Sequence, residues 1–418
     1  MEEPSISELP DELILKIFSL LPLYEESIAT RLLNRLRMEG PWKLVPNVSV
    51  FDDSYNSFVN FMSFVYASLL FNESQILERF HLMLNQKYSA SDINVLVKFA
   101  VKRSVRKLRI QTFENTLELP SCLSSCVTLK SLILRQLSIE VEVPYWFRLP
   151  LLKSLHLLSV KFSGNDSVAK LIQNCPVLED LVINKTRDDN VLIFNINAPS
   201  LRSLSIDNSK GKRTYIEENH GFVINAPSLE KMDFKDTFSN LLVFEHMPEV
   251  TEANIQVICD QSENFIGSLT SIRHLSLCCL SSETPYPSGT TFPYLEHLDL
   301  CTCSAGWANL LVCILNDAPR LKHLKLKSQH GAHYNDPMIL WKEPTVVPEC
   351  LSTHLEIMEW RQYEGTEQER NVAAYILANT TCLNTATFST RCRNKHHRML
   401  RKLKKLNRVS ETCQLLFD

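Results

Sequence analysis

Residues 293–300 read Pro-Tyr-Leu-Glu-His-Leu-Asp-Leu, and residues 319–326 read Pro-Arg-Leu-Lys-His-Leu-Lys-Leu. In both octapeptides a proline is followed by apolar residues at the third, sixth and eighth positions. The same spacing occurs seven times, in copies that begin at Pro150, Pro176, Pro199, Pro227, Pro248, Pro293 and Pro319. The last two apolar positions are two residues apart, which is the period of a strand with one buried face. The pattern therefore predicts one short strand per copy.

The repeats extend beyond the copies that begin with proline. The middle apolar residue of each phrase marks the series, and these markers are Phe80, Leu108, Leu132, Leu155, Leu181, Leu204, Met232, Ala253, Leu275, Leu298 and Leu324. Their spacings range from 21 to 28 residues, and L-x-x-L-x-L at this period is typical of leucine-rich repeats. One unit cannot bury its own apolar ridge, so neighbouring units must stack. The sequence predicts an α/β fold, a curved leucine-rich-repeat solenoid of parallel strands. The returns between strands are expected to be helical or irregular, most clearly helical at residues 167–174 and 307–316.

Composition limits the classes of function. The formal charge of −3 argues against a general nucleic-acid binder. The 13 cysteines are odd in number and form no compact framework, so they are expected to be reduced thiols of an intracellular protein. The acidic start lacks the features of a secretory signal, and the longest apolar stretch, residues 58–71, is too short to span a bilayer. We expect a protein of the cytoplasm or nucleus with no membrane partner.

The C-terminal residues 346–418 are expected to form the last coils and a cap of the stack. Residues 366–369, Thr-Glu-Gln-Glu, match the capping box that begins a helix, which would run to about residue 379. Strand-like phrases lie at residues 355–360, 383–388 and 413–417. The stack is therefore expected to continue almost to the end of the chain.

The N-terminal residues 9–23 are predicted to form a helix, with Pro10 in its first turn and Pro22 closing it. Its apolar positions are too many for one stripe, so it must be buried on more than one side. About 45 residues seldom carry a sufficient core alone. A partner protein is therefore expected to cover part of this helix.

Residues 6–22, Ile-Ser-Glu-Leu-Pro-Asp-Glu-Leu-Ile-Leu-Lys-Ile-Phe-Ser-Leu-Leu-Pro, resemble the opening of an F-box. Residues 42–47 with 51–53 look like the segment that follows the F-box in plant proteins, and residues 347–351 with 359–367 are similar to an FBD domain. Together with the repeats, these stretches resemble the plant F-box, leucine-rich-repeat and FBD protein family. The resemblance implies a small all-α F-box at residues 1–50, leucine-rich repeats at 51–345 and an FBD domain at 346–418.

The resemblance implies the substrate-recognition subunit of an SCF-type ubiquitin ligase. In that family the F-box docks on a Skp-type adaptor, and through it on a cullin core, while the repeats bind the target protein. By match of motif, the adaptor-contacting residues are Leu9, Pro10, Leu13, Ile14, Ile17, Leu21 and Pro22. The alternative is that these residues pack on the repeat array, which would bury them equally well.

The segment at residues 29–42 departs from the family pattern. The first tryptophan of the family's second helix is missing, and Gly40-Pro41 would break that helix. The F-box is therefore partly degenerate. This leaves open a second function, a non-ligase leucine-rich-repeat scaffold whose F-box no longer binds the adaptor.

The repeat register predicts two polar columns on the exposed strand face, about 4.8 Å between neighbouring strands. His274, His297 and His323 precede the markers of three consecutive coils, and Ser276, Asp299 and Lys325 follow them. Cys278, Cys301 and Lys327 lie two residues further on. We expect the histidine, serine, aspartate and lysine positions to form a partner-binding face. The alternatives are a solvated column without a role and a zinc site of His274, His297 and Cys301, although a flat strand face rarely offers tetrahedral geometry.

No catalytic motif stands out in the sequence. A Gly-rich phosphate loop, H-E-x-x-H and a nucleophile elbow are all missing, so no enzyme activity, cofactor or metal is predicted. Residues 391–408 contain nine Lys or Arg and no acid. A nuclear-import or nucleic-acid patch is one interpretation, but the interleaved apolar residues favour a basic-faced helix of the terminal cap.

Overall fold

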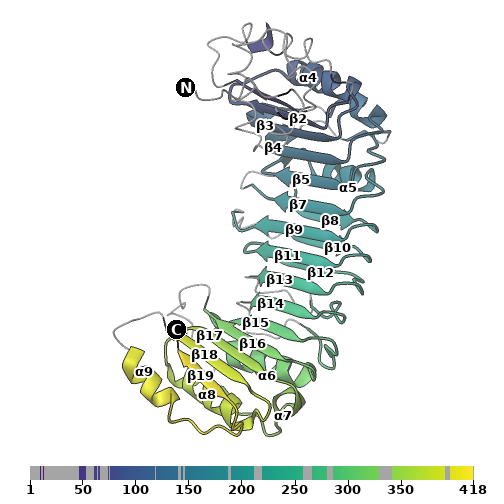
Figure 1. The fold of residues 1–418 in the computed structure, drawn as a ribbon. Helices are drawn as coiled ribbons and strands as arrows, with labels where there is room; N and C mark the ends of the chain where they lie inside the picture. The colour runs from purple at the N-terminus through teal and green to yellow at the C-terminus, as the bar shows by residue number, and fades with distance from the viewer. Residues whose placement is uncertain are drawn as a thin grey trace, which may run out of the picture. The chain divides into compact units, whose positions relative to one another are not determined.

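The structure is a computed structural model, which describes residues 10, 13, 47–52, 61–63, 65, 74, 76–117, 119–139, 143–144, 146–186, 190–210, 219–257, 266–279, 286–328, 341–390 and 396–417. The chain forms two compact units, residues 1–191 and 192–418. In both units most strands are parallel members of a sheet built from one strand per coil (Figure 1). The helices α4–α9 lie in the connections between strands.

The first unit contains a parallel sheet in the order β1-β2-β3-β4-β5-β7, and a short strand, β6, pairs with β4. The strands are β1 (Asn47–Phe51), β2 (Arg79–Leu84), β3 (Lys107–Thr116), β4 (Ser131–Ile139), β5 (Ser154–Leu158), β6 (Lys161–Phe162) and β7 (Asp180–Asn184). The connections contain α4 (Ala90–Lys102), the 3₁₀ helix η3 (Ser121–Ser125) and α5 (Asn165–Gln173).

The second unit contains a parallel sheet in the order β9-β11-β13-β14-β15-β16-β17-β18-β19. Its strands are β9 (Ser203–Asn208), β11 (Lys231–Asp236), β13 (Glu252–Val257), β14 (His274–Cys279), β15 (His297–Cys301), β16 (His323–Lys327), β17 (Ile357–Tyr363), β18 (Thr385–Thr390) and β19 (Gln414–Phe417). Its helices are α6 (Trp307–Asp317), α7 (Glu349–Thr353), α8 (Glu367–Asn379) and α9 (His396–Leu403).

The marker residues pair directly with one another, as the repeat predicts. In the first unit the register joins Val48, Phe80, Leu108, Leu132, Leu155 and Leu181. In the second it joins Leu204, Met232, Ala253, Leu275, Leu298, Leu324, Met358, Ala386 and Leu415. All but Val48 and Leu415 are buried, so stacking neighbouring coils creates the continuous apolar core that no coil has alone. The leucine-rich-repeat fold is confirmed.

Three returns differ from the helical or irregular segments that the sequence predicts. Strands β8 (Ile193–Asn197), β10 (Gly221–Asn225) and β12 (Leu241–Phe244) form a second parallel sheet in the order β12-β10-β8. Alternating residues of these strands are buried, and the Phe222 ring lies 5.3 Å from that of Phe194 and 5.4 Å from that of Phe234. Aromatic side chains in successive returns therefore extend the core and favour strand over helix.

The C-terminal coils follow the prediction closely. The Thr366 hydroxyl accepts a hydrogen bond from the Glu369 amide at 3.2 Å, and the Glu369 carboxylate accepts one from the Thr366 amide at 2.9 Å. This capping box starts α8, which ends at Asn379. In the basic segment α9 spans His396–Leu403, and Leu403 is buried. This agrees with a basic-faced helix that packs on the cap.

Candidate binding groove on the sheet of the second unit

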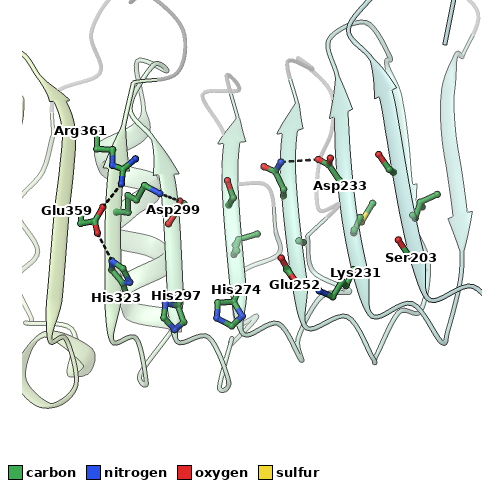
Figure 2. A pocket seen from close by; sticks show the side chains of 18 residues that line it. Ser203, Lys231, Asp233, Glu252, His274, His297, Asp299, His323, Glu359 and Arg361 are labelled. Carbon is green, nitrogen blue, oxygen red and sulfur yellow. Dashed lines mark hydrogen bonds and ion pairs between the residues drawn. The ribbon is translucent and has the colours of Figure 1, made fainter. Parts of the chain in front are cut away.

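The exposed face of the second unit's main sheet is hollowed into a groove of about 590 Å³ (Figure 2). Seven neighbouring strands of this sheet contribute to it, namely β9, β11, β13, β14, β15, β16 and β17. The lining residues are Ser203, Leu204, Ser205, Lys231, Met232, Asp233, Glu252, Ala253, Asn254, His274, Leu275, Ser276, His297, Asp299, His323, Lys325, Glu359 and Arg361. Concave clefts of this size are where proteins bind ligands or segments of partners.

The strand register arranges the polar lining residues in two columns. Residues before the markers pair in the order Ser203, Lys231, Glu252, His274, His297 and His323. Residues after the markers pair in the order Ser205, Asp233, Asn254, Ser276, Asp299, Lys325 and Glu359. Since side chains alternate across a strand, both columns face the groove while the markers between them face the core.

The three histidines of the first column form a row of contacting rings. The His274 and His297 rings are stacked with centroids 4.3 Å apart, and the His297 and His323 rings meet edge to face at 5.4 Å. Partial burial, and then the charges that His274 and His323 can carry, lower the pKa of His297 below its ordinary value. The centre of the row therefore remains neutral near pH 7 and resists protonation as the pH falls.

Every cationic side chain of the groove has a carboxylate partner. Lys231 Nζ lies 2.9 Å from Glu252 Oε2, and Lys325 Nζ donates to Asp299 Oδ2 at 2.8 Å. Arg361 donates to Glu359 at 3.2 Å, as Figure 2 shows. Half-exposed pairs of this kind contribute about 0–1 kcal/mol each. They can therefore exchange partners with a bound molecule at little cost.

The fourth carboxylate of the groove, Asp233, accepts a hydrogen bond from the Asn254 side-chain amide at 2.9 Å. Three Lys or Arg side chains face four carboxylates, so the groove carries a formal charge of −1 when its histidines are neutral. The chemistry offered is recognition by mixed hydrogen bonds and ion pairs, with imidazole rings as a flat surface for stacking.

The structure brings together all six residues that the sequence assigns to a partner-binding face. His274, Ser276, His297, Asp299, His323 and Lys325 line the same groove. Sequence reasoning missed the further charged members Lys231, Asp233, Glu252, Glu359 and Arg361. Lys231, Asp233, Glu252 and Glu359 occupy the same repeat positions in neighbouring coils, so extending the two columns along the register would have found them. Arg361 lies outside both columns, two residues beyond Glu359, and pairs in register with Lys327.

The alternative zinc site is not assembled. His274 is exposed in the groove, whereas Cys301 is buried and donates its S–H to the sulfur of Cys303 at 3.0 Å. The expected exposure of Cys278 and Cys301 is also wrong, because both thiols are buried at the ends of their strands. Along β14 and β15, Ser276 and Asp299 are therefore the last side chains that line the groove.

Most of the predicted adaptor-contacting residues lie outside the described part of the chain, namely Leu9, Ile14, Ile17, Leu21 and Pro22. Of the other two, the Leu13 amide donates to the carbonyl of Pro10 at 3.0 Å, as in a helical first turn. The Leu13 side chain is 49% exposed. Among the described residues, no helix is long and apolar enough to cross a membrane.

The register and the groove define the class: a leucine-rich-repeat protein with a polar groove on one face of its sheet. Comparison with known proteins gives the particular family. A family profile described as FBD matches residues 343–388, and one described as FBD-associated F-box protein At5g56370, LRR repeats, matches residues 93–259.

Two Arabidopsis thaliana proteins are similar along the whole chain. The putative FBD-associated F-box protein At5g56560 is 65% identical over 419 residues and covers 100% of both chains. The F-box/FBD/LRR-repeat protein At5g56570 is 50% identical over 421 residues, covering 100% of this chain and 93% of its own. The chain belongs to the plant F-box, FBD and leucine-rich-repeat protein family.

Proposed function

We propose that this protein is the substrate receptor of an SCF-type ubiquitin ligase. Its N-terminal F-box binds a Skp-type adaptor, and the β9–β17 groove binds a segment of the target protein. The chain itself catalyses nothing, and it acts in the cytoplasm or nucleus. Membership of the F-box, FBD and leucine-rich-repeat family supports the first contact.

The groove supports the second contact, and one observation carries it. Six coils present two aligned columns of polar side chains, a seventh adds Glu359 to the second column, and three of the side chains are histidines whose rings touch. A column without a binding role has no physical need to place aromatic imidazoles beside one another. A target segment lying across the strands would exchange the weak pairs Lys325–Asp299 and Arg361–Glu359 for its own charged groups.

The adaptor contact is tested by capture of a purified Skp-type adaptor on the full-length protein. Replacing Leu13 and Ile17 by Asp should abolish capture, because two carboxylates would enter an apolar contact. Leu151→Asp is the matched control, because Leu151 is another exposed leucine, in the first unit's repeats. Capture that survives the double substitution contradicts this assignment.

The groove is tested by affinity purification from plant cells in which the ligase is stalled, so that targets accumulate. Lys325→Glu combined with His297→Ala should lose the target and keep the adaptor. Lys153→Glu breaks an exposed ion pair with Glu179 in the first unit and provides the control. Equal recovery of targets by the groove variant and the control would exclude the groove as their site.

The altered segment at residues 34–41 favours one other function, a leucine-rich-repeat scaffold that no longer binds the adaptor. That function keeps the groove and loses the ligase. It predicts target capture by the wild-type chain with no adaptor in the same complex. Adaptor binding by a relative with an intact second F-box helix, under the same conditions, is the positive control.

A further inference from the structure

Three buried cysteines meet in the second unit, and none of them belongs to the groove lining. Cys278 lies on β14, Cys301 ends β15, and Cys303 follows in the turn toward α6. Their side chains are 2%, 5% and 8% exposed. Among the described residues they form the one group of three or more metal-ligating side chains whose donor atoms all lie within 4.8 Å of one another. The cluster therefore joins two neighbouring coils and the start of a helix.

The sulfur positions match a coordination shell with small adjustments. The Cys301 and Cys303 sulfurs are 3.0 Å apart, and those of Cys278 and Cys303 are 3.6 Å apart. Thiolates at about 2.3 Å from one metal ion in tetrahedral geometry lie about 3.8 Å from each other. Changes of less than about 1 Å, within reach of a χ1 adjustment, would bring the three sulfurs to that spacing.

Other buried cysteines of the chain have different surroundings. Cys175 and Cys350 each donate the S–H to a main-chain carbonyl oxygen, those of Leu171 and Leu315, at 3.2 Å. This is the ordinary behaviour of a thiol that acts as a small apolar side chain. The three clustered thiols instead hydrogen-bond to one another. Packing alone does not require three sulfurs to converge on one point.

Two positively polarised groups lie close to the cluster along the chain or in the strand register. Helix α6 begins at Trp307, four residues after Cys303, and its amino terminus carries a partial positive charge. Lys327 pairs in register with Cys301 on the adjacent strand, and its carbonyl oxygen accepts a hydrogen bond from the Thr302 amide.

We propose that Cys278, Cys301 and Cys303 bind a thiophilic d¹⁰ cation, Zn²⁺ or Cu(I), through their three sulfur atoms. Soft thiolate ligands select these ions over Mg²⁺, Ca²⁺ or Mn²⁺. The bound ion fastens the β14 and β15 coils to the start of α6 and stabilises the sheet that carries the groove. This role is independent of adaptor or target binding.

Binding must displace the thiol protons, because the thiolate is the metal ligand. Hydrogen bonds with the neighbouring thiols and burial raise the pKa of Cys278, and the hydrogen bond with Cys301 together with burial raises the pKa of Cys303. Each bound ion is therefore expected to release up to three protons, and the apparent affinity should fall steeply as the pH decreases.

The test uses the full-length reduced protein, freed of metal by a chelator and titrated with Cd²⁺, which gives a cadmium–thiolate charge-transfer band in the ultraviolet. One equivalent should saturate the band. Cys301→Ser and Cys303→Ser should each weaken binding at least about tenfold. Cys350→Ser, at a fully buried thiol of the same unit, should match the wild type. Equal affinity of all three variants, or no saturable band in the wild type, overturns the proposal.

A second measurement needs no substitution and therefore does not depend on how the variants fold. X-ray absorption of the wild-type protein loaded with Zn²⁺ or with Cu(I) counts the neighbours of the metal. Zn²⁺ should show three sulfur ligands at about 2.3 Å and one lighter atom, because it prefers four ligands. Cu(I) should show three sulfurs alone. A shell of nitrogen and oxygen only, for both ions, contradicts the assignment.

Discussion

His81 gives a sharp prediction about stability and pH. It lies on β2 with 5% of its surface exposed, and the Phe51 ring meets its edge with centroids 5.5 Å apart. Among the described residues, neither ring nitrogen has a hydrogen-bond partner. Burial, and then the charge of Arg109, lower the pKa of His81 from 6.5 to about 4. The native protein therefore takes up this proton less readily than the unfolded chain.

The sign and size of the effect follow from proton linkage. Because the folded pKa lies below the unfolded one, the first unit loses stability as the pH falls below 6.5, and the loss is nearly complete at the folded pKa. The difference between the two pKa values corresponds to about 2 kcal/mol at about pH 5 and about 3 kcal/mol at about pH 4. Above about pH 7.5 the contribution is absent.

The assay is urea unfolding of wild-type protein and His81→Leu at several pH values. Leu keeps an apolar side chain in the site and removes the titrating ring. As the pH is lowered from about 7.5 to about 4, the free energy of unfolding of the variant should rise by about 3 kcal/mol relative to that of the wild type. His246→Leu, at an exposed histidine, is the matched substitution for the loss of one imidazole. Parallel pH profiles for wild type and His81→Leu would refute the reasoning.

Three further substitutions test the coils. Gly221 has φ of 150°, and a Cβ there would lie 1.9 Å from a main-chain oxygen of β12, so Gly221→Ala should cost about 2–4 kcal/mol in urea unfolding. Gly164→Ala, where a Cβ meets no atom within 4 Å, should be nearly neutral, and equal losses would contradict the backbone argument. Leu298→Ala should cost about 3 kcal/mol because Leu298 is fully buried between two other markers, whereas Tyr294→Ala, at a 47% exposed side chain, should cost less than about 1 kcal/mol. Thr366→Ala removes the cap of α8 and should lower the free energy of unfolding by about 1 kcal/mol, and no change would show that Glu369 alone holds the helix start.

The strands and their register could be predicted because every coil repeats the same pattern of buried apolar residues. A buried leucine at the marker position and another two residues later are enough to fix both the strand and its neighbours. The same register predicts that His274, His297 and His323 lie side by side, as their ring contacts show. The helix of the C-terminal coils could also be predicted, because the capping box at Thr366 is a signal contained in four neighbouring residues.

The returns and the cysteines were harder to predict, for physical reasons. Strands β8, β10 and β12 depend on packing between successive returns, and a short apolar alternation such as Phe222-Val223-Ile224 does not by itself separate strand from irregular chain. Alternation predicts Cys278 and Cys301 on the exposed face, but both are buried, and the sulfur of Cys278 lies 3.6 Å from that of Cys303 in the turn after β15. A pattern within one strand contains no information about a turn that folds over its end.

The coupling of the two ends of the chain is the central claim, and a reconstituted ligase tests it most directly. Target protein recovered by the β9–β17 groove is mixed with the adaptor, the cullin core, ubiquitin and its activating and conjugating enzymes. Wild-type receptor should give ubiquitinated target, whereas Leu13→Asp with Ile17→Asp should bind the same target and transfer no ubiquitin. Transfer by that variant equal to the wild type, or none by the wild type while the adaptor is bound, would contradict the account.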